Sequence, residues 1–427
     1  MKASKYNFFC TSKDEIVAYN SFTGAMALMT PEEYEIFKSF EDGGALENGF
    51  CEELIRGGFI VSDECDELGL VKDAYKKVSA RTDSIGLTIA PTLNCNFRCV
   101  YCYEKSNLDS NVMTTDIQDS LVDYVKRRAA ESKVMNITWY GGEPLLALPV
   151  IKSLSQRFLE IAQEYQIEYR AAIITNGYLL TPSVAKVLKS CKISHCQITI
   201  DGSEKTHNSR RFLKDGSPTF STIFQNLKAV ASILPGIVLR VNVDNKNLDA
   251  LSAVRSILDK QGLSSIKVYP APVRNTWDCY IQGECMTPLE FYKFLLEHAL
   301  KENNSDLLIK QLPRGGNHCV ANSAMGFVVS ADGGIYKCWC DIGIKEYLIG
   351  YITDKGFPEG NKANRFTLSD PFNNPSCLEC KMLPSCWGGC PYDRIHSGFG
   401  SCSPFKWYPE EYIVNTAMVL KEKRGIV

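Results

Sequence analysis

The chain has 427 residues, of which 45% are hydrophobic and 22% are charged, a composition typical of a globular protein with a sizeable core. This length predicts about two to four folded units rather than one. A formal net charge of −2 gives no sign of a nucleic-acid or membrane-surface partner. The sequence shows neither the apolar core of a signal peptide nor the roughly 18 consecutive apolar residues of a membrane span, so a cytoplasmic protein is expected.

The cysteine content indicates whether this is a disulfide-bonded or a metal-binding protein. There are 18 cysteines, and a reducing cytosol disfavours structural disulfides. A secreted disulfide scaffold is normally small and follows a signal peptide. The composition therefore favours metal binding.

Residues 1–82 are predicted to form a small α+β unit of the winged-helix type. Thr30 is a helix N-cap, with Pro31 at the first helical position and Glu33 in the capping-box position. Ile36 and Phe37 are expected to give this helix its apolar face. A second helix is predicted at 47–56, and strands at 7–11, 15–19, 25–29 and 59–61. Such a unit is either a structural cap or a docking module whose strand edge pairs with an extended peptide, the leader of a precursor.

Residues 83–273 alternate strands with helices. The predicted strands are 85–90, 136–140, 171–175, 196–200, 237–243 and 265–269, and the predicted helices are 115–131, 150–164, 182–189, 221–234 and 248–261. Six βα units with apolar strands predict an α/β fold, a parallel sheet covered by helices and closed or partly closed as a (β/α)6 barrel. In such folds the chemistry lies at the carboxyl ends of the strands.

The remaining chain is less regular. Residues 274–317 are expected to be a bridging region with a helix at 288–301, and 318–427 a cysteine-rich domain. A long irregular segment is unusual in a compact domain. Metal ligation would replace its missing core.

Three cysteines follow the first predicted strand of the barrel, at the spacing Cys95-x3-Cys99-x2-Cys102. Three thiolates on one loop can bind three irons of a cubane cluster and leave the fourth iron open to a small molecule. Structural cysteines in an ordinary turn are the alternative. The turn Gly141-Gly142-Glu143-Pro144 follows the second strand.

These two motifs and the six βα units resemble the radical S-adenosylmethionine (SAM) superfamily, in which a [4Fe–4S] cluster cleaves SAM to a 5′-deoxyadenosyl radical. The resemblance covers roughly residues 85–273. It implies that Cys95, Cys99 and Cys102 bind the cluster and that carbonyl groups of Gly141, Gly142, Glu143 and Pro144 accept hydrogen bonds from the methionine ammonium, with glycines allowing the close approach. It also implies that Tyr101 lies against the adenine and that Thr199 and Arg211 contact the sugar and the carboxylate.

A second cysteine pattern lies near the C-terminus. Cys377-x2-Cys380-x5-Cys386-x3-Cys390 is followed by Cys402 and preceded by Cys319 and Cys338. At this composition about 0.001 chance matches to the four-cysteine spacing are expected. A zinc ribbon is the competing interpretation, because C-x2-C pairs also bind zinc; seven cysteines exceed what one zinc ion needs.

The pattern resembles the SPASM extension of radical SAM enzymes, which holds two auxiliary [4Fe–4S] clusters and would bring the total to three. The resemblance implies that Cys377, Cys380, Cys386 and Cys402 bind one auxiliary cluster, and that Cys319, Cys338 and Cys390 bind the other. One iron of the latter then lacks a ligand. Cys340, Cys279 or Cys285, or a substrate thiolate could fill the position; the C-x-C spacing of Cys338 and Cys340 disfavours Cys340.

Asp341 is a candidate catalytic base. Sulfatase-maturing relatives place an aspartate just after the cysteine that matches Cys338, but Trp339 and Cys340 intervene here. A surface carboxylate in a turn is the favoured interpretation of Asp341.

The sequence as a whole resembles radical SAM/SPASM peptide maturases, which modify ribosomally synthesised peptides and are related to anaerobic sulfatase-maturing enzymes. The expected reaction is a thioether or, second, a carbon–carbon crosslink, with electrons from an external flavodoxin- or ferredoxin-type donor. Formylglycine formation and peptide epimerisation are the enzymatic alternatives. An iron–sulfur electron carrier or a zinc-binding scaffold is the non-enzymatic one.

Overall fold

The computed structural model describes residues 1–46, 48–234, 236–302, 304–311, 319–353, 366, 369–397 and 402–424. The chain forms two compact units. Unit 1 comprises Met1–Ser79, Thr287–Cys319 and Arg365–Val427, and unit 2 comprises Ala80–Met286 and Val320–Asn364. Residue 47, where the second helix was predicted to begin, and the domain boundary expected between 317 and 318 lie outside the described residues.

Unit 2 is built on a sheet whose described strands lie in the order β11-β10-β9-β8-β7-β6-β12-β13-β14. The strands are β6 (Ser84–Ile89), β7 (Val134–Trp139), β8 (Glu168–Thr175), β9 (Ile193–Thr199), β10 (Ile237–Val243), β11 (Lys267–Pro272), β12 (Gly326–Val329), β13 (Gly334–Tyr336) and β14 (Gly350–Tyr351). The run from β6 to β11 is parallel and in sequence order. This part confirms the predicted α/β fold with a mostly parallel sheet.

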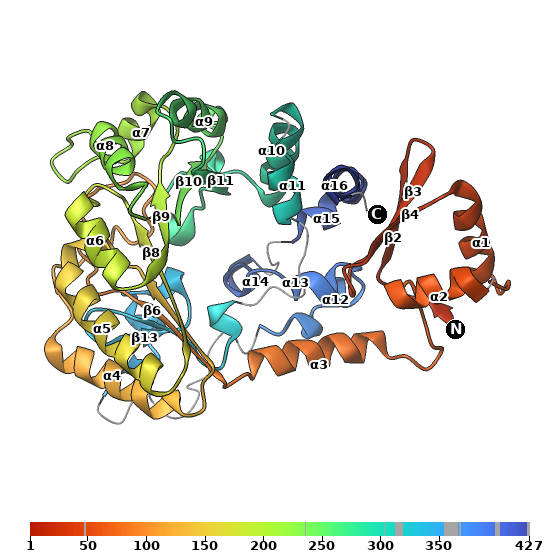
Figure 1. Cartoon of the computed structure of the whole chain (residues 1–427), viewed down its shortest axis with the longest axis horizontal. Coiled ribbons are helices and arrows are strands. Elements are labelled where there is room, and N and C mark those ends of the chain that lie inside the picture. Colours follow the sequence, from red (N-terminus) through yellow and green to blue (C-terminus); the bar gives the residue numbers. More distant parts are fainter. Residues whose placement is uncertain are drawn as a thin grey trace. The chain divides into compact units, whose positions relative to one another are not determined.

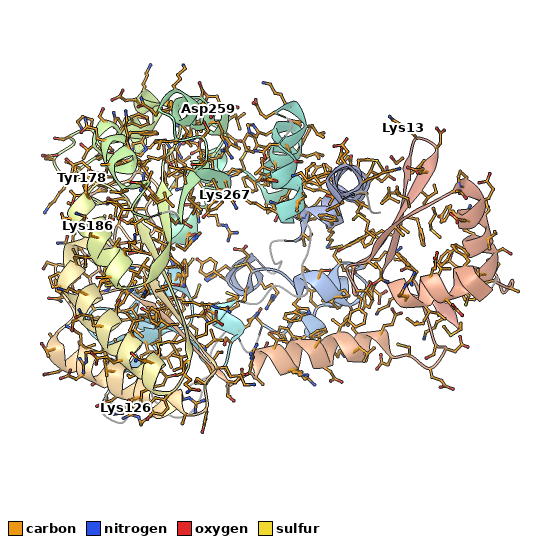
Figure 2. The ribbon with its side chains drawn as sticks, in the orientation of Figure 1. Lys13, Lys126, Tyr178, Lys186, Asp259 and Lys267 are labelled. Carbon is orange, nitrogen blue, oxygen red and sulfur yellow. The ribbon has the colours of Figure 1, made fainter. Side chains whose placement is uncertain are left out.

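Helices connect these strands and lie along the outer side of the sheet (Figure 1). They are α4 (Thr115–Ala129), α5 (Leu148–Glu164), α6 (Pro182–Ser190), α7 (Glu204–Arg210), α8 (Phe220–Val230) and α9 (Ala250–Lys260). All of them except α7 turn an apolar side to the sheet, and Figure 2 shows Lys126, Lys186 and Asp259 on the solvent side. The buried side chains of α7 are the polar residues His207 and Arg210. Short 3₁₀ turns occupy Pro144–Ala147, Thr276–Asp278, Gln282–Glu284, Val320–Asn322, Trp339–Asp341 and Lys345–Tyr347.

The barrel sheet continues into residues that sequence reasoning assigned to the cysteine-rich segment. β12 pairs in parallel with β6, placing Val328 opposite Thr88, and β13 and β14 follow antiparallel. Val328, Tyr336 and Ile342 pack in one core with Ala90 and Leu93, the residues that lead from β6 to the cysteine loop. The segment 318–427 thus contributes to both units.

Unit 1 contains two small antiparallel sheets, β2-β3-β4 and β1-β5. Their strands are β1 (Lys2–Ala3), β2 (Asn7–Ser12), β3 (Glu15–Asn20), β4 (Met26–Met29) and β5 (Ile60–Val61). Its helices are α1 (Pro31–Glu41), α2 (Asn48–Gly57), α3 (Glu67–Ser79), α10 (Pro288–Lys301), α11 (Ser305–Gln311), α12 (Pro375–Leu378), α13 (Leu383–Cys386), α14 (Pro391–Ser397), α15 (Pro404–Trp407) and α16 (Pro409–Arg424), with a 3₁₀ turn at Pro371–Asn373.

Helix α1 begins as predicted. The Thr30 hydroxyl accepts a hydrogen bond from the Glu33 amide at 3.2 Å, and the Glu33 carboxylate accepts one from the Thr30 amide at 2.7 Å. Of the two residues predicted to form its apolar face, only one is buried. Phe37 is fully buried in the core formed with β3 and β4, whereas Ile36 is 40% exposed, because adjacent residues of a helix point about 100° apart.

A second core in unit 1 joins distant parts of the sequence. Tyr6 and Val71 pack against Phe372, Leu383 and Trp387. Val71 lies on α3, a helix that sequence reasoning did not predict, and Leu383 lies on α13 between two of the C-terminal cysteines. The N-terminal residues and the cysteine-rich segment therefore form a single folded body. None of the helices described is long and apolar enough to cross a membrane.

Replacing Phe37 with alanine should destabilise the β2-β3-β4 layer by about 3–5 kcal/mol, because a buried aromatic side chain leaves a cavity. Hydrogen–deuterium exchange of the β2 and β3 amides would measure this as faster exchange. Ile36→Ala is the matched control, and it should change exchange little because exposed positions usually contribute less than about 0.5 kcal/mol. Equal effects of the two substitutions would contradict the assigned helix orientation.

Candidate active site

The cysteine loop follows β6 and is fastened to the segment after α7. The Arg98 amide donates to the Phe212 carbonyl at 2.8 Å, and the Val100 amide donates to the Arg210 carbonyl at 3.0 Å. These backbone bonds fix Cys95, Cys99 and Cys102 on one anchored loop. Their side chains are partly buried.

Burial dominates the protonation of these thiols. It raises the pKa of Cys95 to about 12, and it also raises the pKa values of Cys99 and Cys102. The Arg211 guanidinium opposes the shift at Cys99. Thiolates at such positions need a strong positive charge beside them, which a bound iron centre supplies.

The Gly141–Gly142 turn packs directly on the chain that leads into the cysteine loop. A Cβ on Gly141 would lie 2.5 Å from the Thr92 carbonyl oxygen, and a Cβ on Gly142 would lie 2.3 Å from the Asn94 carbonyl oxygen. Gly141 also has φ +111°, in the region that favours glycine. Sequence reasoning explained these glycines by approach to a ligand; the structure adds the approach of two backbone segments.

Glu143 connects this turn to the end of β8. Its carboxylate accepts hydrogen bonds from the Thr175 hydroxyl at 2.7 Å and from the Leu145 and Asn176 amides at 3.0 and 2.8 Å. Burial raises the pKa of Glu143, and these hydrogen bonds oppose the shift. Asn176 in turn donates to the side chain of Asn96 in the cysteine loop at 2.8 Å. The Glu143 side chain thus holds the ends of β7 and β8 against the loop, while Pro144 begins the following 3₁₀ turn.

The Tyr101 hydroxyl joins side chains from three further segments. It donates to Asp201 Oδ2 at 2.5 Å and accepts from Arg211 Nη1 at 2.8 Å and from Asn242 Nδ2 at 3.1 Å. Asp201 follows β9 and Asn242 lies at the end of β10. The predicted residues Tyr101 and Arg211 are therefore brought together at the carboxyl edge of the sheet. Thr199 is buried at the last position of β9.

A buried ion network supports this arrangement. Arg210 bridges Asp201 at 3.1 Å and Asp244 at 2.8 Å, and all three side chains are almost inaccessible to solvent. Tyr280 donates to Asp244 at 3.0 Å. Sequence reasoning placed Asp201 and the 242–245 segment at strand ends but gave Arg210, Asp244 and Tyr280 no role. Pattern alone could not show that Arg210 turns inward.

Several polar atoms in this region are buried without a hydrogen-bond partner among the described residues. They are Asp201 Oδ1, Arg210 Nη2 and Arg211 Nε. Buried polar groups are normally paired. A polar ligand with both positive and negative groups, such as a methionine moiety, would satisfy these atoms, so the residues present fit SAM.

The residues 274–286 pass along the cysteine loop. The Cys279 thiol donates to the Tyr101 carbonyl at 3.3 Å, and Lys105 donates to the Cys279 carbonyl at 2.7 Å. Trp277 donates to the Cys340 carbonyl at 2.6 Å. Of the candidates for the missing auxiliary ligand, Cys279 therefore faces the cysteine loop, and Cys285 is partly buried.

Cys338 and Cys340 lie together in unit 2, where their thiols are hydrogen-bonded. This bond and burial raise the pKa of Cys338. Cys319 and Cys390 belong to unit 1, so the ligand set of Cys319, Cys338 and Cys390 stays a prediction.

The expectation that Asp341 is a surface carboxylate is wrong. Its side chain is only 1% exposed, because the turn Trp339–Asp341 packs into the β12–β13 core.

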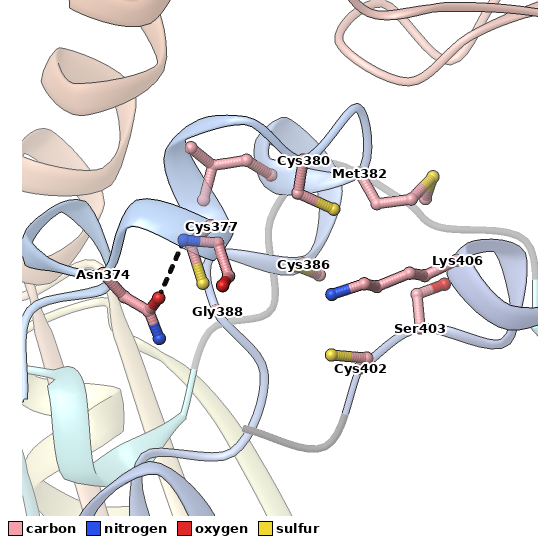
Figure 3. Close-up of a pocket in the computed structure, with 11 residues that line it drawn as sticks. Asn374, Cys377, Cys380, Met382, Cys386, Gly388, Cys402, Ser403 and Lys406 are labelled. Carbon is pink, nitrogen blue, oxygen red and sulfur yellow. Dashed lines mark hydrogen bonds between the residues drawn. The ribbon is translucent and has the colours of Figure 1, made fainter. Parts of the chain in front are cut away.

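The other four C-terminal cysteines surround one pocket in unit 1. Figure 3 shows Cys377, Cys380, Cys386 and Cys402 around this pocket together with Lys406. Among the described residues, no three His, Cys, Asp or Glu side chains are gathered tightly enough to hold a single metal ion. A cubane instead takes its thiolates from around a larger body, and the sulfur-lined pocket fits such a group.

Comparison with known proteins identifies the barrel. Residues 89–254 match the model of the radical SAM superfamily. The barrel is a radical SAM domain. Such a domain works with a [4Fe–4S] cluster and SAM, and relatives that are named as enzymes support an enzymatic role for the chain.

Two curated relatives match most of the chain. A cysteine-type anaerobic sulfatase-maturating enzyme of Clostridium novyi is 25% identical over 376 residues, which are 79% of this chain and 98% of that protein. The radical SAM cyclopropyl synthase TigE of Paramaledivibacter caminithermalis is 20% identical over 89% of this chain and 84% of its own length.

Solved structures share the fold of this chain. anSMEcpe with bound AdoMet aligns with a TM-score of 0.62 at 19% identity over 80% of this chain and all of that chain. Streptococcus suis SuiB bound to its precursor peptide SuiA aligns with a TM-score of 0.52 at 14% identity over 94% of this chain and 99% of that chain.

The contact of Gly142 with the cysteine loop can be tested by substitution. Gly142→Ala should cost about 1–3 kcal/mol of stability, because the added methyl meets two backbone carbonyls that cannot move as a side chain does. Thermal unfolding of the iron-free protein would measure the loss. Gly283→Ala is the control, since a Cβ there meets nothing within 4 Å. An unchanged midpoint for Gly142→Ala would contradict the packing described.

Proposed function

We propose that this radical SAM enzyme modifies a ribosomally synthesised peptide by forming a thioether, or second a carbon–carbon, crosslink. The observation that carries the proposal is the presence in one chain of two separate sulfur-lined sites, the cysteine loop of the barrel and the four-cysteine pocket of unit 1. A crosslink removes two hydrogen atoms from the peptide, which amounts to two protons and two electrons. It therefore needs an electron acceptor besides the group that removes the first hydrogen atom.

At the barrel site, Cys95, Cys99 and Cys102 would hold a [4Fe–4S] cluster. Bound with SAM, this cluster supplies the 5′-deoxyadenosyl radical that takes a hydrogen atom from a substrate carbon. The carbonyls of Gly141–Pro144 would accept from the methionine ammonium, and Arg211 would pair with its carboxylate. Thr199 would face the sugar and Tyr101 the adenine, with Asp201 and Asn242 holding the Tyr101 ring in place.

The C-terminal cysteines would hold the acceptor for the remaining electron. Cys377, Cys380, Cys386 and Cys402 would bind one auxiliary [4Fe–4S] cluster, and Cys319, Cys338 and Cys390 a second one. An external flavodoxin- or ferredoxin-type protein would supply the electron for SAM cleavage. Asp341, buried three residues after Cys338, would act as a base toward the substrate only if the peptide reaches it.

Formylglycine formation is the second candidate. The sulfatase-maturating relative from Clostridium novyi matches this chain along 98% of its own length, so the overall similarity supports this reaction as well as a crosslink. Epimerisation is a third outcome that the test below distinguishes.

Co-expression with a short peptide encoded nearby, followed by mass spectrometry, tests the reaction. A thioether predicts the loss of two hydrogens, one cysteine fewer for iodoacetamide to alkylate, and no reaction with an aldehyde probe. An aldehyde-reactive product would instead establish formylglycine, and an unchanged mass with altered retention would establish epimerisation. Either result would overturn the crosslink.

Iron content tests the two kinds of site separately. Three cubanes predict about twelve irons per chain. Replacing Cys95, Cys99 and Cys102 with alanine should remove about four irons and abolish SAM cleavage. Replacing Cys377, Cys380 and Cys386 should also remove about four irons but leave SAM cleavage intact while stopping peptide modification. Bound zinc at the latter site would contradict the cluster assignment.

The three-stranded sheet of unit 1 is the proposed docking site for the peptide's leader. Its edge strand β4 pairs only with β3 among the described strands, and the helix α1 that follows it also contacts it. An extended peptide can add to a free edge through backbone hydrogen bonds. Because residues 1–79 share a core with the C-terminal segment, deleting them would expose that core.

Hydrogen–deuterium exchange of the intact enzyme is therefore the better test of leader docking. Adding the full-length precursor should slow exchange of the β4 amides, with the α2 amides as the internal control. Binding of the precursor without protection of β4 would contradict the docking site.

A further inference from the structure

Lys406 stands out among the residues around the four-cysteine pocket because it carries a positive charge. The other lining side chains are cysteines or neutral residues, including Asn374, Ser376, Met382 and Ser403. In Figure 3 the amino end of Lys406 points between Cys386 and Cys402 toward the middle of the pocket. The Lys406 ammonium also lies 5.3 Å from the centroid of the Trp407 ring, and no ion pair with a carboxylate is described for it.

The ammonium acts on the thiols of the pocket. Burial raises the pKa of the Cys402 thiol, and the positive charge of Lys406 opposes this shift. At Cys377, burial again raises the pKa, and both Lys406 and Arg394 oppose it. Lys406 therefore lies within electrostatic reach of two of the four cysteines.

The other nearby cation is held differently. The Arg394 guanidinium donates to the carbonyls of Trp387, Gly388 and Gly389 at 3.2, 2.9 and 3.1 Å, and to Ser369. Its donors are thus occupied by the turn that carries Cys386 and Cys390. Lys406, by contrast, points its amino end into the pocket.

Local structure positions Lys406. The Ser403 side chain caps α15 by accepting from the Phe405 amide at 3.3 Å, and Phe405 is fully buried against Tyr19 and Tyr412. Cys402 precedes this cap and Lys406 follows Phe405 in the same short helix. The buried Phe405 anchor thereby fixes the backbone from which the Lys406 side chain enters the pocket.

We propose that Lys406 raises the reduction potential of the auxiliary cluster held by Cys377, Cys380, Cys386 and Cys402, and so makes this site the acceptor of the electron that leaves the peptide. Reduction adds one negative charge to a cluster, and a nearby cation and an N–H donor to sulfur both stabilise the reduced form. Burial weakens solvent screening, so the effect should persist at moderate salt. The inference rests on the proposed cluster assignment.

The test is a redox titration of the reconstituted holoenzyme followed by electron paramagnetic resonance. The signal of this cluster is assigned by its absence from the Cys380→Ala variant. Lys406→Met should shift its midpoint to a more negative potential, Lys406→Gln should shift it less because a donor remains, and Lys406→Arg should stay near wild type. Lys381→Met is the control, because this exposed lysine follows Cys380 but lies over Phe8 and does not line the pocket.

The outcomes separate the two proposals. If Cys380→Ala keeps all its iron and every signal, the cluster assignment fails. If the assignment holds but Lys406→Met leaves the midpoint unchanged, or Lys381→Met shifts it equally, the role of Lys406 is refuted. Loss of the cluster from both Lys406→Met and Lys406→Gln, with retention in Lys406→Arg, would show that Lys406 holds the cluster rather than tunes it, and would also overturn the inference.

Discussion

The close packing of the Gly141–Gly142 turn on residues 92–94 is the constraint on which the barrel site depends. These two segments leave neighbouring strands, β7 and β6, and approach until no Cβ fits between them. Three cysteines begin immediately after the contact. A loop of eight residues cannot hold three thiols in fixed positions by its own hydrogen bonds, so the rigid base beneath it supplies the order that a multi-ligand site requires.

Acidic and basic side chains are paired at the same edge of the sheet. Asp201 and Asp244 are paired through Arg210, and Arg211 and Asn242 meet at the Tyr101 hydroxyl. A buried charge without a partner is costly, so each of these groups depends on the others. Asp201, Arg210 and Arg211 each keep one buried polar atom without a hydrogen-bond partner among the described residues, which a zwitterionic ligand would satisfy. Pre-arrangement of this kind reduces the cost of ordering a ligand.

Much of the barrel was predictable because its strands are apolar and separated by helices of ordinary length. All six strands occur within about three residues of the predicted positions. Helix α16 could also have been found, since Pro409 and the acidic residues 410–411 mark a helix start. Helix α3 could not, because the core that buries Val71 includes residues about 300 positions away. The inward turn of Arg210, the burial of Asp341 and the contact of Lys406 with sulfur likewise depend on tertiary packing that spacing does not encode.

At both sulfur-lined sites, burial disfavours the thiolate form of a cysteine, and a nearby cation opposes this effect. Burial raises the pKa of a thiol at each of them, to about 12 for both Cys95 and Cys386, because a low-dielectric surrounding disfavours the thiolate. Each site also holds a cation beside a cysteine: Arg211 near Cys99 and Lys406 at Cys402. Arginine keeps its charge under all conditions and is fixed by Tyr101, whereas lysine is a compact point charge with three rotatable donors. The barrel site is thereby suited to orienting a ligand, and the pocket of unit 1 is suited to stabilising an added electron.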